Sequence, residues 1–224
     1  MNTTAIIVAA GSSQRMGFDK LAAPLAGVPV LRRTLEAFLT SDCIAEIVVV
    51  CSAERWKLLE NATGGRFAKP VRRVDGGATR QDSVANGLAA VAAGADLIAV
   101  HDGARPLVSP LDIARCVAAG GTFRAASLAR RVSETLKRAD GDDFCTQSVA
   151  RDDLWLMETP QVFDASLLHS AYAAVAAKRL EITDEVSAMQ AIGIHVKFIE
   201  ANQPNPKITR PADLVLAGAI LTIQ

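Results

Sequence analysis

Two cationic side chains flank a turn of small residues near the start of the chain. The segment from Ala9 to Gly17 reads AAGSSQRMG and contains Arg15, and Lys20 follows it closely. Small residues at the carboxyl end of a strand let backbone N–H groups approach an anion, and open α/β sheets bind ligands at that end. Because both cations stay charged at neutral pH, the spacing predicts a site for a triphosphate-sized anion. The alternative is a tight turn with two solvated cations.

Two further segments are expected at the same edge of the sheet. The segment from Asp75 to Ser83 reads DGGATRQDS, so its glycines permit close backbone approach to a ligand and Ser83 offers a hydroxyl donor. The alternative is that residues 81–83 only cap the next helix. Asp102 ends an apolar strand, and Mg²⁺ on a nucleotide usually takes one or two protein carboxylates. Asp102 is therefore a candidate metal contact, with an Asp102–Arg105 ion pair as the alternative. His101 is expected to pack or to form hydrogen bonds.

The elements that must position these residues alternate along the chain. Short apolar runs predict strands, and Ala/Leu segments at helical spacing lie between them, which indicates parallel strands joined by helical crossovers. Residues 47–50 are apolar in succession, so both faces of that strand should be covered, as in a doubly wound sheet. The expected strands are 5–9, 46–51, 97–101 and 195–199, and the expected helices are 30–39, 83–93, 167–177 and 212–221, with Thr183 capping a further helix.

Residues 125–149 interrupt this alternation. Two extended pieces on either side of a polar ADGDD turn predict a β-hairpin. Because a two-stranded arm is marginally stable alone, we expect it to pack on a second copy of the chain. The fold class is therefore predicted as a doubly wound, mostly parallel α/β fold, with residues 1–224 forming one domain and an arm at about 130–150.

Composition excludes several other classes of protein. The 224 residues carry 24 Lys+Arg and 24 Asp+Glu, which argues against a broad basic field for nucleic acid or a membrane surface. No apolar run approaches the roughly 20 residues of a membrane span, and the first residues do not resemble a signal peptide. The four cysteines are scattered and form no metal or redox motif, so they are expected to be reduced and buried, in a cytoplasmic protein.

Six motifs, in one order, carry a resemblance to a known family. They are AAGSSQRMGxxK, DGGxxRxDSV, VHDGARP, TPQVF, ITDE and KITRPxDL. Together they resemble the 2-C-methyl-D-erythritol 4-phosphate cytidylyltransferases of the non-mevalonate isoprenoid pathway, and the resemblance extends from Ile6 to Leu216. It implies CTP and methylerythritol phosphate as substrates, Mg²⁺ as cofactor, transfer of CMP with release of pyrophosphate, and a homodimer joined through the arm.

The resemblance also implies residue roles. Arg15, Lys20, Arg151 and Lys207 would be catalytic. The nucleotide would contact Ala9, Ala10, Gly11, Gly77, Ser83, Asp102 and Gly103, and the second substrate would contact Asp102, Arg105, Thr135, Arg151, Thr159 and Lys207, some of them across the dimer.

Two departures from the family pattern bear on these roles. Residues 203–206 read QPNP, so two prolines stiffen the segment before Lys207, and Gly77 is followed by Ala78, so contacts there must come from the backbone.

Three alternative functions stay open at the level of sequence. A sugar-phosphate nucleotidyltransferase of different specificity would share the first loop. A nicotinamide-dependent oxidoreductase is disfavoured because the glycine fingerprint of dinucleotide-binding folds is absent. The first loop is not a Walker loop either, because it lacks Gly-Lys-Ser/Thr. A non-catalytic nucleotide-sensing dimer is disfavoured because the cations are retained.

Overall fold

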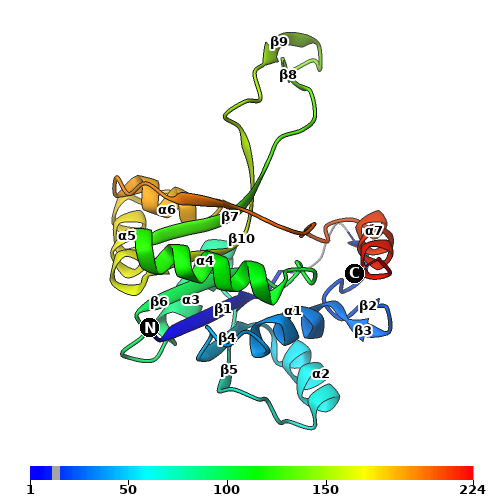
Figure 1. The fold of residues 1–224 in the computed structure, drawn as a ribbon, viewed down its shortest axis with the longest axis vertical. Coiled ribbons are helices and arrows are strands. Elements are labelled where there is room, and N and C mark those ends of the chain that lie inside the picture. The colour runs from blue at the N-terminus through cyan, green and yellow to red at the C-terminus, as the bar shows by residue number, and fades with distance from the viewer. Residues whose placement is uncertain (12–15, 224) are drawn as a thin grey trace.

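A seven-stranded sheet forms the centre of the protein, in a computed structural model that describes residues 1–11 and 16–223, apart from the side chains of residues 62 and 63. The strand order is β11-β7-β10-β6-β1-β4-β5 (Figure 1). The strands of this sheet are β1 (Thr3–Val8), β4 (Glu46–Val50), β5 (Val71–Val74), β6 (Leu97–Asp102), β7 (Ala125–Arg131), β10 (Trp155–Asp164) and β11 (Lys197–Glu200). A small ladder pairs β2 (Pro24–Leu25) with β3 (Val28–Pro29). The helices are α1 (Val30–Leu39), α2 (Ala53–Thr63), α3 (Arg80–Ala89), α4 (Pro110–Phe123), α5 (Ala165–Lys178), α6 (Glu185–Ala191) and α7 (Pro211–Leu221).

The strand directions confirm the predicted fold class. Strands β5, β4, β1 and β6 run parallel to one another, and β11 runs parallel to β7. Strand β10 is antiparallel to both of its neighbours, β6 and β7. The sheet is therefore mostly parallel, and the crossovers carry the connecting helices, as a doubly wound α/β fold requires.

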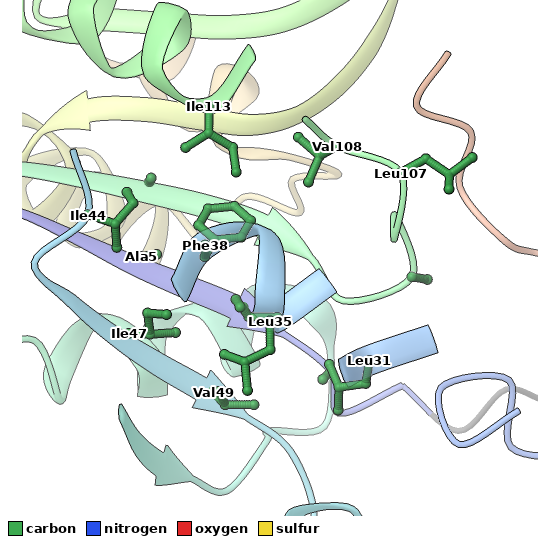
Figure 2. Close-up of a cluster of buried hydrophobic side chains, with 14 of the residues drawn as sticks. Ala5, Leu31, Leu35, Phe38, Ile44, Ile47, Val49, Leu107, Val108 and Ile113 are labelled. Carbon is green, nitrogen blue, oxygen red and sulfur yellow. The ribbon is translucent and has the colours of Figure 1, made fainter. Parts of the chain in front are cut away.

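Apolar side chains cover both faces of the sheet. Alternate residues of β1 point to opposite faces, so Ala5 and Ile7 belong to one buried cluster and Ile6 to another. Helices α1 and α4 supply the first cluster, where Phe38 lies between the sheet and Ile113 (Figure 2). Helices α3, α5 and α6 supply the second. Every residue of β4 is buried, which confirms that both faces of this strand are covered.

Several element boundaries differ from those expected. Sequence patterns missed α2, α4 and β10, and β10 escaped notice because Pro160 interrupts its apolar run. Helix α3 begins at Arg80 rather than at Ser83, since Thr79 caps it. Asp184, not Thr183, caps α6.

The arm is a separate two-stranded antiparallel sheet of β8 (Leu136–Ala139) and β9 (Cys145–Val149). It stands out from the body, carried by the ends of β7 and β10 (Figure 1). At its base the Arg131 guanidinium lies 4.4 Å from the centroid of the Trp155 ring. The prediction of a hairpin from residue 125 onwards was wrong in its first part, because residues 125–129 are buried in the central sheet as part of β7.

The arm also explains an error in the expected burial of the cysteines. All four thiols are free, and Cys51 and Cys116 are buried, but Cys43 is only partly buried and Cys145 is exposed. Cys145 belongs to β9, whose residues are mostly exposed within one chain. Within the described part of the chain, no helix is long and apolar enough to cross a membrane.

Candidate active site

A cavity of about 640 Å³ opens at the carboxyl ends of β1 and β6. This is the edge at which open α/β sheets bind ligands. Eight of the predicted site residues line it: Ala9, Ala10, Gly11, Lys20, Gly77, Ser83, Asp102 and Lys207. Five others, Gly103, Arg105, Thr135, Arg151 and Thr159, are not among the residues that line it, and Arg15 lies outside the described residues.

Asp102 is the centre of a charged cluster in this cavity. Its carboxylate lies 2.8 Å from Lys207 Nζ, 3.3 Å from Arg80 Nε and 3.7 Å from Arg105 Nε. Burial alone would raise the pKa of the Asp102 carboxyl, but the charges of Lys207 and Arg80 outweigh burial and hold that pKa well below its usual range. The carboxylate is therefore ionised at neutral pH. The Asp102–Arg105 pair considered from sequence is present, but the contact with Lys207 is closer.

Arg80 is a site residue that the sequence analysis missed. It lines the cavity, and its two terminal nitrogens bind the buried Glu185 carboxylate at 2.8 and 3.0 Å, while Nε contacts Asp102. Burial lowers the pKa of Arg80, but the Glu185 carboxylate more than compensates and raises it. The Tyr172 hydroxyl donates to the same carboxylate at 2.9 Å. A signal was available, because a cation in the first turn of α3 opposes the helix dipole and needs another reason to be there.

Two loops meet closely at the cavity wall. A Cβ atom added to Gly76 would lie 2.2 Å from the Ala10 Cβ atom, so only glycine permits this approach. The Ser83 hydroxyl accepts from the Gly77 N–H at 3.1 Å and donates to the Thr79 carbonyl at 2.9 Å. Ser83 thus fixes the glycine turn, and the capping role belongs to Thr79 and Asp82, which form a capping box.

A chain of hydrogen bonds beneath Asp102 fixes the tautomer of His101. Because a carbonyl only accepts, the His101 Nε2 proton goes to the Arg105 carbonyl at 3.1 Å. Nδ1 then accepts from the Thr159 hydroxyl at 3.0 Å, and that hydroxyl accepts from the Asp102 N–H at 3.1 Å. Burial lowers the pKa of His101 to about 4, so the ring is neutral. Thr159 and His101 support the backbone of Asp102, and His101 packs and forms hydrogen bonds, as the sequence predicted.

The segment before Lys207 is fixed at Asn205. The Asn205 side-chain amide donates to the Thr159 carbonyl at 2.9 Å, and the Asn205 carbonyl accepts from Arg105 Nη1 at 2.7 Å. The second terminal nitrogen of Arg105 donates to the Met157 carbonyl. Arg105 is therefore a support between β10 and this segment, and the two prolines on either side of Asn205 do not prevent Lys207 from reaching Asp102.

Lys20 and Gly103 contribute in different ways. The Lys20 ammonium donates to the Ile208 carbonyl at 2.8 Å, which places it beside Lys207 in the cavity. The Gly103 N–H donates to the Val8 carbonyl, and the Gly103 carbonyl accepts from Thr34. Both polar groups of Gly103 are thus used within the fold.

Thr135 and Arg151 are exposed on the arm. The Arg151 guanidinium donates to the Ser133 carbonyl, which joins the two ends of the arm near its base. The single chain does not bring either residue to the cavity wall.

The donor set suits a metal that arrives with phosphate ligands. Asp102 is the only carboxylate among the described residues that line the cavity, and no group of three or more His, Cys, Asp or Glu residues elsewhere in the described ranges could hold a metal ion. A protein-only metal cage is therefore not formed by these residues. Mg²⁺ on a nucleotide needs only one or two carboxylates, and Asp102 is ionised and faces the cavity.

Comparisons with known proteins identify the family of this chain. The family model for 2-C-methyl-D-erythritol 4-phosphate cytidylyltransferase matches residues 3–223. The chain belongs to this family. It is 38% identical over 225 residues to the cytidylyltransferase of Caldanaerobacter subterraneus subsp. tengcongensis, with 99% of each chain covered, and 39% identical over 222 residues to that of Prochlorococcus marinus, with 98% of each covered.

Solved structures of cytidylyltransferases share the fold. The crystal structure from Thermus thermophilus has a TM-score of 0.81 at 33% identity and covers 99% of this chain and 100% of that chain. The 4-diphosphocytidyl-2C-methyl-D-erythritol synthase of Anaerococcus prevotii has a TM-score of 0.87 at 28% identity, covering 99% and 96%. The resemblance stated from the motifs is thus confirmed over nearly the whole chain.

Proposed function

We propose that this chain transfers CMP from CTP to 2-C-methyl-D-erythritol 4-phosphate and releases pyrophosphate, in the biosynthesis of isoprenoid precursors. The observation that carries the proposal is a cavity lined by Lys20, Arg80 and Lys207, in which Arg80 and Lys207 pair with one ionised carboxylate, Asp102, in a chain of this family. A cavity of about 640 Å³ is also within the usual range for small-molecule sites.

The reaction follows from the distribution of charge. A phosphate oxygen of methylerythritol phosphate attacks the α-phosphorus of CTP, and the bond to pyrophosphate breaks. No general base is required, since a phosphate monoester is already ionised at neutral pH. Negative charge accumulates in the transition state, so catalysis is positioning plus stabilisation by cations, without a covalent enzyme intermediate.

The four cations have two separate roles in this reaction. Arg15 and Lys20 stabilise the α-phosphate and the leaving group, while Lys207 and Arg151 hold the attacking phosphate in line. Asp102 is the residue that would hold Mg²⁺, and the ion would supply positive charge against the triphosphate. In the single chain the Lys207 ammonium pairs with Asp102 at 2.8 Å, at the wall of the cavity that receives the substrates.

Homodimerisation supplies the residues on the arm. Thr135 and Arg151 are exposed and do not line the cavity of their own chain, which supports a site completed by the arm of a second copy. Phe144, at the arm's turn, is exposed, and burial of its ring by a partner would stabilise the same arrangement.

The decisive experiment is incubation of the protein with methylerythritol phosphate and each of CTP, UTP, ATP and GTP, with pyrophosphate release and the nucleotide product measured. We expect turnover with CTP and little with the purine nucleotides. The two loops approach each other closely, so their backbone groups can contact a pyrimidine ring, but a purine ring should not fit between them. Comparable rates with ATP or GTP would refute this interpretation of the base pocket. A parallel incubation with a sugar phosphate as acceptor tests the alternative nucleotidyltransferase, which would be favoured by turnover with the sugar phosphate but not with methylerythritol phosphate.

A further inference from the structure

Arg55 lies just outside the cavity and binds two points of the chain that border it. It occupies the first turn of α2, where Ser52 caps the helix by accepting from the Arg55 N–H. Its side chain is 11% exposed. The guanidinium donates from Nε and Nη2 to the two oxygens of Asp19 at 2.8 and 3.0 Å, and from Nη1 to the Ala9 carbonyl at 2.6 Å.

The two acceptors stand at opposite ends of the glycine-rich segment. Ala9 follows β1 directly and lines the cavity, while Asp19 immediately precedes Lys20, whose side chain lines the cavity too. One planar guanidinium therefore fixes the distance between the start of this segment and the residue before Lys20. Because the Arg fork has a rigid geometry, three such bonds constrain both position and orientation.

Asp19 fixes the backbone on both sides of Lys20. The Oδ1 atom that accepts from Arg55 also accepts from the Leu21 N–H at 3.0 Å, and the Asp19 carbonyl accepts from the Ala23 N–H at 3.1 Å. These bonds close a turn with Lys20 inside it. The Lys20 ammonium then reaches the Ile208 carbonyl, next to Lys207.

We propose that Arg55 is a positioning residue for Lys20 and for the backbone that receives the nucleotide. This inference rests on the proposed function. Arg55 does not touch substrate, but it holds the Lys20 ammonium in position to contact the α-phosphate and the leaving pyrophosphate. A displacement of about 1 Å in such a group can lower turnover by as much as about a hundredfold, so a residue that sets this distance has a kinetic role.

The competing explanation is that Arg55 only anchors α2 to the body of the protein. Both explanations expect some loss of thermal stability when Arg55 is replaced, so stability alone does not distinguish them. They differ in their coupling to Lys20. If Arg55 acts on kcat through Lys20, replacing it has no further effect on kcat once the Lys20 ammonium is gone, and its hold on the Ala9 backbone is measured separately as CTP affinity. An anchor of α2 has an independent effect on kcat.

The test compares Arg55→Lys, Lys20→Ala and the double variant, with Glu36→Gln as the matched control. Arg55→Lys keeps the charge but loses the fork, and Glu36→Gln removes an ion pair of similar length, Arg32–Glu36 at 2.8 Å, on the outside of α1. We expect Arg55→Lys to lower kcat roughly ten- to a hundredfold. KM for methylerythritol phosphate should stay unchanged, and Glu36→Gln should match the wild type. Asp19→Asn should reproduce the effect of Arg55→Lys, because it weakens the same pair.

The double variant and a binding measurement decide the outcome. The kcat of Arg55→Lys/Lys20→Ala should equal that of Lys20→Ala, and calorimetry should show weaker CTP binding by Arg55→Lys than by the wild type. Wild-type kcat in Arg55→Lys, or a double variant whose losses multiply, would overturn the proposal. If the wild type binds CTP but transfers no CMP, the proposed function fails, and the CTP affinity of Arg55→Lys still tests whether Arg55 positions the nucleotide site.

Discussion

The charged side chains of the cavity are fixed by contacts within one chain, whereas those of the arm are exposed to solvent. Around Asp102 the cations are held by carboxylates and carbonyls of the same chain, and the side chain of Arg105 is 11% exposed. On the arm, Thr135 and Arg151 are exposed, and most residues of β8 and β9 are exposed as well. Folding of one chain therefore preorganises the cavity, whereas only a second surface can fix the arm. The comparison shows that one chain forms the cavity by itself, and that Thr135 and Arg151 could reach such a cavity only if a second chain binds the arm.

The largest effect is expected inside the cavity. Lys20→Ala should lower kcat by roughly 10² to 10³, the range for loss of one preorganised contact to the transition state. CTP binding should weaken less, because the ground state keeps its other contacts. Steady-state kinetics with CTP as the varied substrate measures both. Turnover within a few-fold of the wild type would remove Lys20 from the catalytic group.

The second prediction asks whether the arm completes the cavity of a partner. Arg151→Ala and Lys207→Ala chains should each be almost inactive, but a mixture should regain activity. In a randomly exchanged equal mixture half of the dimers are mixed, and each of these has one intact site of two, so about a quarter of wild-type activity should return. Mass spectrometry confirms that mixed dimers have formed. Mixed dimers without activity would mean that each site is built within one chain.

The third prediction uses pH to separate the buried floor of the cavity from the exposed arm. Burial lowers the pKa of His101 to about 4, against an ordinary value of 6.5, so the unfolded chain binds the proton first as pH falls. The free energy of unfolding should therefore decrease as pH falls from 6.5 to about 4, on the order of 3 kcal/mol from this group at about 1.4 kcal/mol per pH unit.

Comparison with His101→Gln isolates the contribution of the imidazole, since carboxylates also titrate near pH 4. Urea unfolding at pH 7 and at pH 4 should show a smaller pH-dependent loss in the variant than in the wild type. Equal losses in the two proteins would contradict a neutral, buried His101.

The smallest effect is expected at the tip of the arm. Phe144 is 72% exposed, so Phe144→Ser should change the free energy of unfolding of isolated chains by no more than about 0.5 kcal/mol. Phe38 is fully buried in α1, and Phe38→Ala should cost about 3–5 kcal/mol. Chemical denaturation at a protein concentration where sedimentation shows single chains measures both. A large loss in Phe144→Ser would show that the tip packs on its own chain.

The same contrast explains what the sequence could predict. Short apolar runs in β1, β4 and β6 identified the parallel part of the sheet, because strands covered on both faces have few polar residues. Residues near β1 and β6 were assigned to one edge because parallel strands share their carboxyl ends. Both inferences depend on short stretches of sequence, and both place the site residues at the carboxyl ends of the parallel strands. The antiparallel β10 left no such pattern, because Pro160 interrupts its apolar run and its first residues, 155–157, are not buried.

The missed site residues depend on pairing between distant segments. Arg80 belongs to a motif that the sequence analysis quoted, but its partner Glu185 lies 105 residues further along the chain. Arg55 and Asp19 are likewise 36 residues apart. The place of Arg80 in the first turn of α3 indicates that it needs a partner, but neither sequence separation identifies that partner, so only the folded chain reveals these contacts. The roles of Thr135 and Arg151 stay predictions, since they concern a second copy.

Strand β10 joins the arm to the cavity without an intervening loop, from Trp155 at the base of the arm to Thr159 beneath Asp102. The pairing of β10 with β7 shifts register between Met157 and Gln161, so the place of Thr159 depends on the number of residues in this segment, and one inserted residue would displace Thr159 from Asp102. The turn at residues 140–144 carries no such constraint, and exposed tips tolerate insertions. The arm can therefore lengthen or shorten during evolution at its tip, which would let the fit in the proposed dimer diverge while the chemistry of the cavity is retained.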